Sequence, residues 1–289
     1  MQMDKNTYID GFMTECRELG IDKGDIVYIS SDVTRLTMDA MKQCSLKGKS
    51  GRDGFFDSFV DALKDLVGPE GTLLFPVFTW SFCRGIPYDV KKTQGEVGAL
   101  GNWVLNNRED FSRTEHPLYS FMVWGRDAQK LVSMHNLTAW GDDSPFAYLL
   151  NEHGKNLLID ISLEGCFTFA HFVEESIGIP VRYYKDFTGE YVTSDGVSET
   201  RTYTMFVRDL DIDSRQVTPD DCLVRDGAAR MSDYRGMELQ VVDLHASYPF
   251  IEKNFREDNG DEWYDFMGYT IDWAAGQTHP DETRVYKRR

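Results

Sequence analysis

Apolar residues follow two alternating patterns along the first part of the chain. Apolar positions recur at helical intervals over residues 8–19 and 55–67, and each of these segments leads through a turn into a short apolar run, at 26–29 and 72–78. Helical spacing predicts amphipathic helices, and short apolar runs bounded by turn residues predict buried strands. The pattern therefore predicts that the chain opens as repeated helix, turn and strand.

The same alternation continues to residue 177. Helices are predicted at 98–106, 145–152 and 167–177, and strands at 121–124 and 156–161. Strands that alternate with helices favour a central, mostly parallel sheet with helices packed on its faces. We therefore expect ligands to bind at the ends of the strands.

The pattern changes after Pro180. Residues 182–191 and 199–208 are typical of antiparallel strands joined through the turn-prone sequence Thr-Ser-Asp-Gly, and a last helix is predicted at 244–255. No linker or internal repeat divides the chain. We expect an α/β fold with an antiparallel hairpin insert in its C-terminal part, as a single domain over 1–273, followed by a polar C-terminal tail at 274–289.

Composition narrows the function classes. The formal net charge of the 289 residues is −17, which argues against nucleic-acid binding, because such proteins present clustered basic residues. The negative charge would attract a cationic small molecule, although acidic surfaces mostly serve solubility. No apolar stretch approaches the roughly 20 residues of a membrane span, and the polar start lacks a signal-peptide pattern. We expect a cytoplasmic protein that binds no membrane.

The strongest candidate for chemistry is the pair His171 and Glu174. Three residues apart on a predicted helix, the two side chains would lie on one face. An imidazole can take a proton from an attacking amine, and a neighbouring carboxylate can fix its tautomer. A surface pair or a buried core histidine is the alternative interpretation of the same spacing.

Two further segments could line a ligand pocket. His116 and Ser120 lie in a polar loop before a predicted strand and could bind an acyl group, or Pro117 could simply shape the strand entry. The glycine-rich turn that leads into Gly98, Ala99 and Leu100 could hold a phosphate at a helix start, or be an ordinary turn. A metal held by His116, His171 and Glu174 is conceivable, but these side chains suit proton transfer equally well, and we expect no metal.

Taken in order, several segments resemble the motifs of the aminoglycoside 3-N-acetyltransferase family, over about residues 19–180. The matching segments are GDIVYISS at 24–31, GPEGTLLFP at 68–76, VGAL at 97–100, RTEHPLYS at 113–120, GDDSP at 141–145 and TFAHFVE at 168–174. The resemblance implies an acetyltransferase-like domain that acylates amino groups on sugars with acetyl-CoA.

The resemblance also implies roles for particular residues. Acetyl-CoA would lie near Ser30 and Ser31, near the turn at Gly98, Ala99 and Leu100, and near the loop from His116 to Ser120. His171, oriented by Glu174, would deprotonate the acceptor amine, while His116 would position these groups. Backbone amides near Ser31 and the Ser120 hydroxyl are candidate donors for the oxyanion of the tetrahedral intermediate.

The chain departs from the family where relatives often carry His and Ser in the first strand motif, because it has Ser30 and Asp32 there. Residues 78–90 are similar to relatives associated with surface-polysaccharide sugars. We therefore expect an amino-sugar acceptor, either a surface-glycan deoxyamino sugar or an aminoglycoside, and also consider a homodimer. The alternatives are an acyl ester or thioester hydrolase and a catalytically silent sugar-binding protein. Asp186, Glu190 and Asp195 could face the sugar, or form a solvated hairpin.

Overall fold

The computed structural model describes residues 3–281. Its helices, apart from the short 3-10 turn η1 (Phe82–Arg84), are α1 (Lys5–Glu18), α2 (Thr34–Gln43), α3 (Gly48–Val67), α4 (Ala99–Asn107), α5 (Ala128–Val132), α6 (Pro145–Asn151), α7 (Leu163–Cys166), α8 (Phe169–Ile177), α9 (Cys222–Arg225) and α10 (Leu244–Glu257). Helices predicted from apolar spacing reappear as α1, α3, α4, α6, α8 and α10, with ends displaced by a few residues. The longest displacement is at α3, which begins at Gly48 rather than at residue 55.

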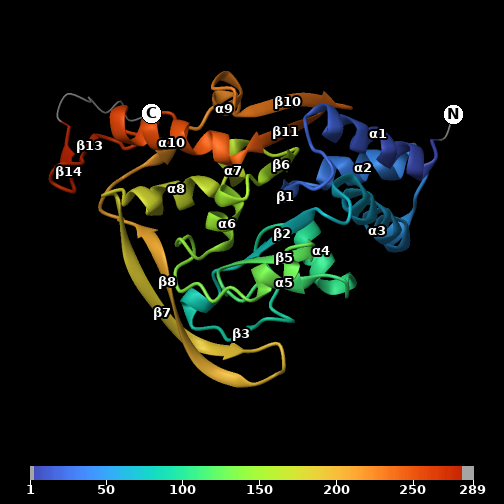
Figure 1. The fold of residues 1–289 in the computed structure, drawn as a ribbon, viewed down its shortest axis with the longest axis horizontal. Helices are drawn as coiled ribbons and strands as arrows, with labels where there is room; N and C mark the ends of the chain where they lie inside the picture. Colours follow the sequence, from blue (N-terminus) through green and yellow to red (C-terminus); the bar gives the residue numbers. More distant parts are fainter. Residues whose placement is uncertain (1–2, 282–289) are drawn as a thin grey trace.

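A seven-stranded sheet forms the centre of the fold (Figure 1). In spatial order it contains β10 (Ala229–Tyr234), β11 (Met237–Asp243), β6 (Lys155–Ile159), β1 (Ile26–Ser31), β2 (Thr72–Phe78), β5 (Tyr119–Gly125) and β4 (Ser112–Arg113). Smaller sheets join β3 (Tyr88–Asp89) with β7 (Arg182–Val192) and β8 (Ser198–Arg208), β9 (Arg215–Gln216) with β12 (Tyr264–Asp265), and β13 (Tyr269–Asp272) with β14 (Gln277–Pro280).

The expected α/β class and helix-flanked sheet are confirmed, but parallel pairing is limited to the centre of the sheet. β1 pairs in parallel with β2 and with β6, whereas β5 runs antiparallel to β2 and β11 antiparallel to β6. Arg113 and Tyr119 are joined by a connection too short for a crossover, so the chain can only reverse between β4 and β5. This reversal sets the 114–118 loop beside the end of β2, where the Thr79 amide donates to the Leu118 carbonyl at 3.1 Å.

Helices cover both faces of the sheet because the side chains of its strands alternate. In β1, Val27 and Ile29 join a core formed with α1, α2, α3 and α4. Ile26 and Tyr28 point into the opposite core, formed with α6, α8 and α10. The central strand is thus buried on both sides, as its continuous apolar run predicted.

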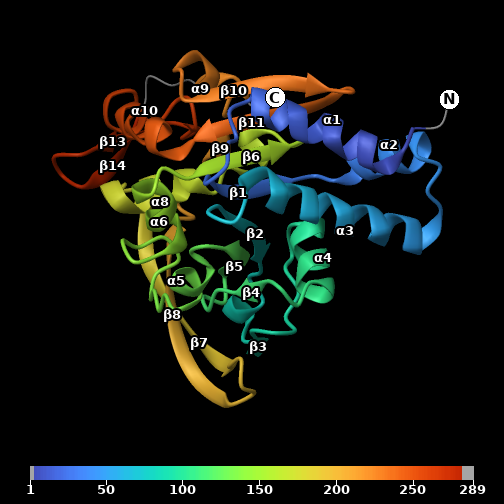
Figure 2. The ribbon, with the colours of Figure 1, turned by 45° about the vertical axis from the view of Figure 1, so that its right-hand side comes forward.

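The expected antiparallel insert is confirmed as the β7–β8 hairpin. Its two eleven-residue strands pair along their whole length, from Arg182 opposite Arg208 to Val192 opposite Ser198. Figure 2 shows the hairpin as a long curved ribbon that leaves the end of α8 and extends to β3. The insert therefore begins directly behind the helix that carries His171.

The C-terminal segment contributes one strand to the described residues. Within the segment 274–289, which we predicted as a polar tail, residues 277–280 pair with β13 as β14, and residues 282–289 lie outside the described part. Among residues 3–281, no helix combines the length and the apolar character that crossing a membrane requires.

Candidate active site

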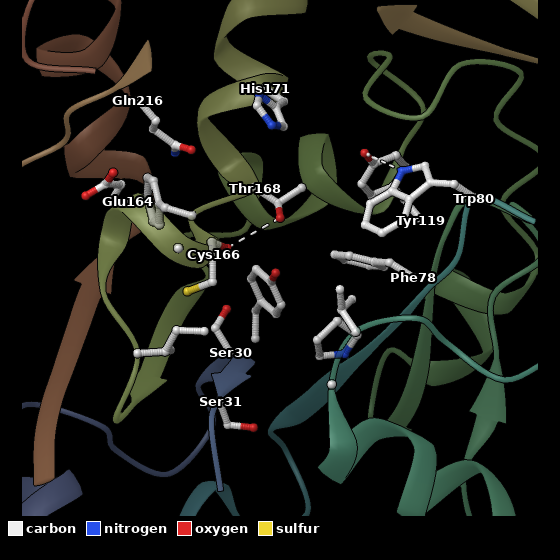
Figure 3. A pocket seen from close by; sticks show the side chains of 17 residues that line it. Ser30, Ser31, Phe78, Trp80, Tyr119, Glu164, Cys166, Thr168, His171 and Gln216 are labelled. Carbon is white, nitrogen blue, oxygen red and sulfur yellow. Dashed lines mark hydrogen bonds between the residues drawn. The ribbon is translucent and has the colours of Figure 1, made fainter. Parts of the chain in front are cut away.

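A pocket of about 270 Å³ opens where β1 and β2 end (Figure 3). Ser30 and Ser31 line it from β1, and Phe78 lines it from β2. On the opposite side, Thr168 and His171 line it from the start of α8. The carboxyl ends of the parallel strands thus form the floor of the pocket, which is where the α/β pattern predicts a ligand site.

His171, Glu174 and Arg182 form a hydrogen-bonded group, here called the His171 cluster. His171 Nδ1 lies 2.6 Å from Glu174 Oε2, and Arg182 Nη2 lies 2.8 Å from the same oxygen. The side chains of Glu174 and Arg182 are only 1% and 9% exposed, while that of His171 is 29% exposed. Glu174 and Arg182 are therefore largely buried, and of the three side chains only the imidazole lines the pocket.

The contacts of Glu174 fix the tautomer of His171. Burial acts to raise the pKa of Glu174, but the charges of Arg182 and His171 outweigh it and hold the pKa below its ordinary value. An ionised carboxylate can only accept hydrogen bonds, so His171 Nδ1 must carry the hydrogen that it shares with Glu174. The other nitrogen, Nε2, is left with a lone pair, and Figure 3 shows the ring pointing from α8 into the pocket.

The protonation state of His171 follows from its surroundings. Burial, together with the positive charge of Arg182, lowers the pKa of the imidazole, and Glu174 only partly opposes this shift. His171 is consequently neutral at neutral pH and able to accept a proton.

Phe78, Trp80 and Tyr119 form an aromatic wall of the pocket, and the buried Trp140 packs against both Tyr119 and His171. The ring of Trp140 lies 5.2 Å from the imidazole and 4.7 Å from the ring of Tyr119. Trp80 Nε1 donates to the Tyr119 hydroxyl at 3.1 Å, and burial raises the pKa of Tyr119 to about 12. The wall is thus uncharged at neutral pH and leaves His171 as the basic group that faces it.

A second set of contacts anchors Trp80 and the glycine turn at the end of β2. Glu96 Oε1 accepts from the Trp80 amide at 3.0 Å, from Thr79 Oγ1 at 2.9 Å and from Arg84 Nη2 at 2.6 Å. The turn then enters α4 at Gly98, which lines the pocket with a φ of +81°. A Cβ at Gly98 would lie 2.9 Å from the Pro76 carbonyl oxygen, so glycine suits both the dihedral and the close approach.

The residues predicted to bind the cofactor are only partly brought together. Ser30, Ser31 and Gly98 line the pocket, and Ser30 Oγ is held by Asn156 Nδ2 at 3.0 Å. Ala99 and Leu100 form the first turn of α4, where no side chain caps the amides, but the Leu100 side chain is buried in the core. The backbone of this turn, rather than its side chains, is what a ligand could reach.

The structure places His116 and Ser120 outside the pocket. His116 Nδ1 accepts from the amides of Leu118 and Tyr119 at 3.3 and 3.4 Å, and burial lowers its pKa to about 3. The Ser120 hydroxyl is fully buried and donates to the Val77 carbonyl at 3.0 Å while accepting from Arg113 Nε at 3.0 Å. Both side chains brace the loop and strand that carry Tyr119, so any contribution to the site is indirect.

Several residues of the site were missed in the sequence. Arg182 was assigned only to a strand, Trp80 and Thr168 were not assigned to the site, and Tyr119 was included only as part of the loop from His116 to Ser120. No local signal marks Arg182, since it meets Glu174 only because the hairpin insert folds back against α8. Within residues 3–281, no group of three or more His, Cys, Asp or Glu side chains is arranged to hold a metal ion.

Comparison with known proteins places this architecture among characterised relatives. The family model described as aminoglycoside 3-N-acetyltransferase matches residues 41–256. The aminoglycoside N(3)-acetyltransferase III of Serratia marcescens is 27% identical over 192 residues, which cover 60% of this chain and 65% of that protein. The matched region therefore spans slightly under two thirds of the curated relative.

Solved structures share the fold at lower identity. AAC-IIIb in binary complex with CoASH superposes with a TM-score of 0.69 at 20% identity, covering 90% of this chain and 98% of that one. AAC-VIa bound to sisomicin gives 0.66 at 20% identity, with coverage of 90% and 99%. The YokD protein of Bacillus subtilis gives 0.63 at 18% identity, with coverage of 86% and 98%.

Proposed function

Because the chain belongs to the aminoglycoside 3-N-acetyltransferase family, as its motifs predicted, we propose that it transfers the acetyl group of acetyl-CoA to an amino group of an amino sugar. The observation that carries this proposal is the His171 cluster, in which a buried carboxylate leaves a basic Nε2 facing the pocket. The acceptor is a deoxyamino sugar of a surface glycan or an aminoglycoside, and the reaction takes place in the cytoplasm.

The reaction needs one base and no covalent intermediate on the protein. The neutral amine of the acceptor attacks the thioester carbonyl while His171 Nε2 takes a proton from the attacking nitrogen. The tetrahedral intermediate collapses by breaking the C–S bond, and the proton on His171 passes to the departing thiolate. Glu174 stabilises the imidazolium that exists between these two proton transfers, since its carboxylate lies 2.6 Å from Nδ1.

A cysteine nucleophile fits the pocket poorly. Cys166 lines the pocket, but burial raises the pKa of its thiol to about 12. A thiol with that pKa holds almost no thiolate at neutral pH, and the thiolate is the nucleophilic form. Direct attack of the amine therefore accounts for the site better than acetylation of Cys166 would.

Acetyl-CoA would lie across the floor and aromatic wall of the pocket. The amides at the start of α4, behind Gly98, carry no side-chain cap and suit the pyrophosphate. Ser30 and Ser31 at the end of β1 suit the thioester end, and the amide region of Ser31 is the nearest candidate for the oxyanion. The Ser120 hydroxyl would have to give up its bond to the Val77 carbonyl to take that part.

A thiol-release assay tests the proposal. The purified chain is mixed with acetyl-CoA and, in turn, with aminoglycosides, nucleotide-linked amino sugars and no amine. We expect release of CoA thiol that depends on the amine and is matched by N-acetylated sugar in the mass spectrum. Thiol release without an amine would indicate a hydrolase, and calorimetric binding of a sugar without binding of acetyl-CoA would indicate a sugar-binding protein.

A further inference from the structure

We propose that Arg182 is a positioning residue for the base: it holds Glu174 in the orientation that receives the His171 Nδ1 hydrogen, and its charge keeps the imidazole neutral. This inference rests on the proposed function, in which His171 is the base. Arg182 does not line the pocket and would not contact either substrate. Its effect on the reaction would pass entirely through Glu174 and His171.

The geometry gives Arg182 a fixed place in the His171 cluster. Its Nη2 lies 2.8 Å from Glu174 Oε2 and 3.0 Å from His171 Nδ1. Its Nη1 donates at 3.3 Å to the carbonyl of Phe206 in β8, across the hairpin. Arg182 is the first residue of β7, so the hairpin insert, rather than α8, delivers the guanidinium to the base.

One hydrogen bond in this group excludes another. Since Nδ1 of His171 carries a hydrogen and gives it to Glu174, Nδ1 has no lone pair with which to accept from Arg182. The 3.0 Å between Arg182 Nη2 and His171 Nδ1 therefore places a permanent positive charge beside the imidazole, and no hydrogen bond between these two atoms offsets the repulsion. Such a charge opposes formation of the imidazolium and favours the free base.

The other titratable groups around His171 are neutral or face the pocket. Tyr119 from β5 and Cys166 from α7 have pKa values raised to about 12 by burial. Tyr264 from β12 lies beside Glu174 and Arg182, and burial raises its pKa as well. Glu164 lines the same pocket from α7. Among residues 3–281, the charges in direct contact with the imidazole are thus those of Glu174 and Arg182.

The test is the titration of His171 itself, which requires neither acetyl-CoA nor an acceptor. The ring of His171 is followed by NMR in histidine-labelled protein; the chain has six histidines, and the signal lost in His171→Gln is that of His171. In Arg182→Met we expect the midpoint of His171 to rise by about one to two pH units, the size of shift that a neighbouring charge produces.

Matched controls separate the charge from general effects of mutation. Arg208 lies directly opposite Arg182 in the hairpin, is exposed, and bonds Ser214 rather than the His171 cluster. Arg208→Met should leave the His171 midpoint unchanged. Arg182→Lys keeps the positive charge and should stay close to wild type, and Arg182→Gln serves as the neutral variant if Arg182→Met does not fold.

The outcomes are distinct. An unchanged midpoint in a folded neutral variant, or an equal rise in Arg208→Met or Arg182→Lys, overturns the proposal. The acidic limb of kcat/KM against pH should move upward with the NMR midpoint. If the midpoint moves and the limb does not, Arg182 still controls His171, but His171 is not the base of the proposed function.

Discussion

Glu174→Gln tests whether the carboxylate behind His171 serves the reaction. The substitution keeps the size of the side chain and removes its charge at a position that is 1% exposed and lies 2.6 Å from His171 Nδ1. A hydrogen bond to a charged group is worth about 1.5–3 kcal/mol, and each 1.4 kcal/mol is a factor of ten in rate, so kcat should fall about 10- to 150-fold. Affinity for acetyl-CoA should persist, because Glu174 does not line the pocket.

The neighbouring glutamate offers a matched control. Glu175 is also buried, and burial raises its pKa, but within residues 3–281 no side-chain hydrogen bond or ion pair joins it to His171, whose Nδ1 partner is Glu174. In Glu175→Gln, kcat should stay within about twofold of wild type. The buried environment of Glu175 already disfavours its negative charge, so removing that charge should change the site little.

The assay is acceptor-dependent thiol release at saturating acetyl-CoA, with calorimetry for CoA binding and thermal unfolding to confirm folding. Removing Glu174 leaves Arg182 without its carboxylate, and breaking a buried ion pair costs up to about 3–5 kcal/mol of stability, so kcat is compared only well below the unfolding temperature. A folded Glu174→Gln enzyme with wild-type kcat, or an equal loss in Glu175→Gln, would refute the role given to Glu174.

Three further predictions follow from individual contacts. Burial and the charge of Arg182 lower the pKa of His171, and the neutral imidazole is the active base. After correction for ionisation of the acceptor, the acidic limb of kcat/KM against pH should therefore have its midpoint below 6.5, the ordinary pKa of histidine. A midpoint above pH 7 would contradict this. Gly101→Ala would put a Cβ 2.1 Å from the Pro76 carbonyl oxygen and should lower the free energy of unfolding by about 1–3 kcal/mol in a denaturant titration, whereas Gly54→Ala, with nothing within 4 Å, should not destabilise the protein. Burial lowers the pKa of His116 to about 3 in the folded chain, so between pH 6.5 and 3 the unfolded chain binds a proton that the folded chain does not. The free energy of unfolding should therefore decrease as the pH is lowered from 6.5 to 3, and it should decrease less steeply in a folded His116→Gln variant.

Much of the fold could be predicted from local sequence patterns. The strand at 72–78 was predicted to the residue, because the Gly-Pro-Glu-Gly turn at 68–71 precedes its apolar run. The direction of β5 was not predictable in the same way, since an apolar run looks the same whether the chain crosses over or reverses. The five residues between Arg113 and Tyr119 are too few for a crossover, so the chain must reverse its direction there. This could not be seen in the sequence, because β4 has only two residues and gives no periodic pattern.

The same distinction applies to the site: contacts within one helix could be predicted from the sequence, and contacts between distant elements could not. His171 and Glu174 were predictable because they are three apart on one helix, where geometry follows from spacing. Arg182 was not, since its contact with Glu174 depends on how the hairpin insert packs against α8. Neighbouring residues of a strand point in opposite directions, so Tyr119 could line the pocket while Ser120 does not, and the residue types alone favoured Ser120.

The most direct measurement of the central claim compares wild type with His171→Ala at saturating acetyl-CoA and a saturating amino sugar that wild type acetylates. The account predicts equal amounts of free thiol and N-acetylated sugar from wild type, and a turnover reduced at least about 100-fold in His171→Ala, as expected for the loss of a general base. CoA binding should remain in the variant. Turnover close to that of wild type in a folded His171→Ala would contradict the account.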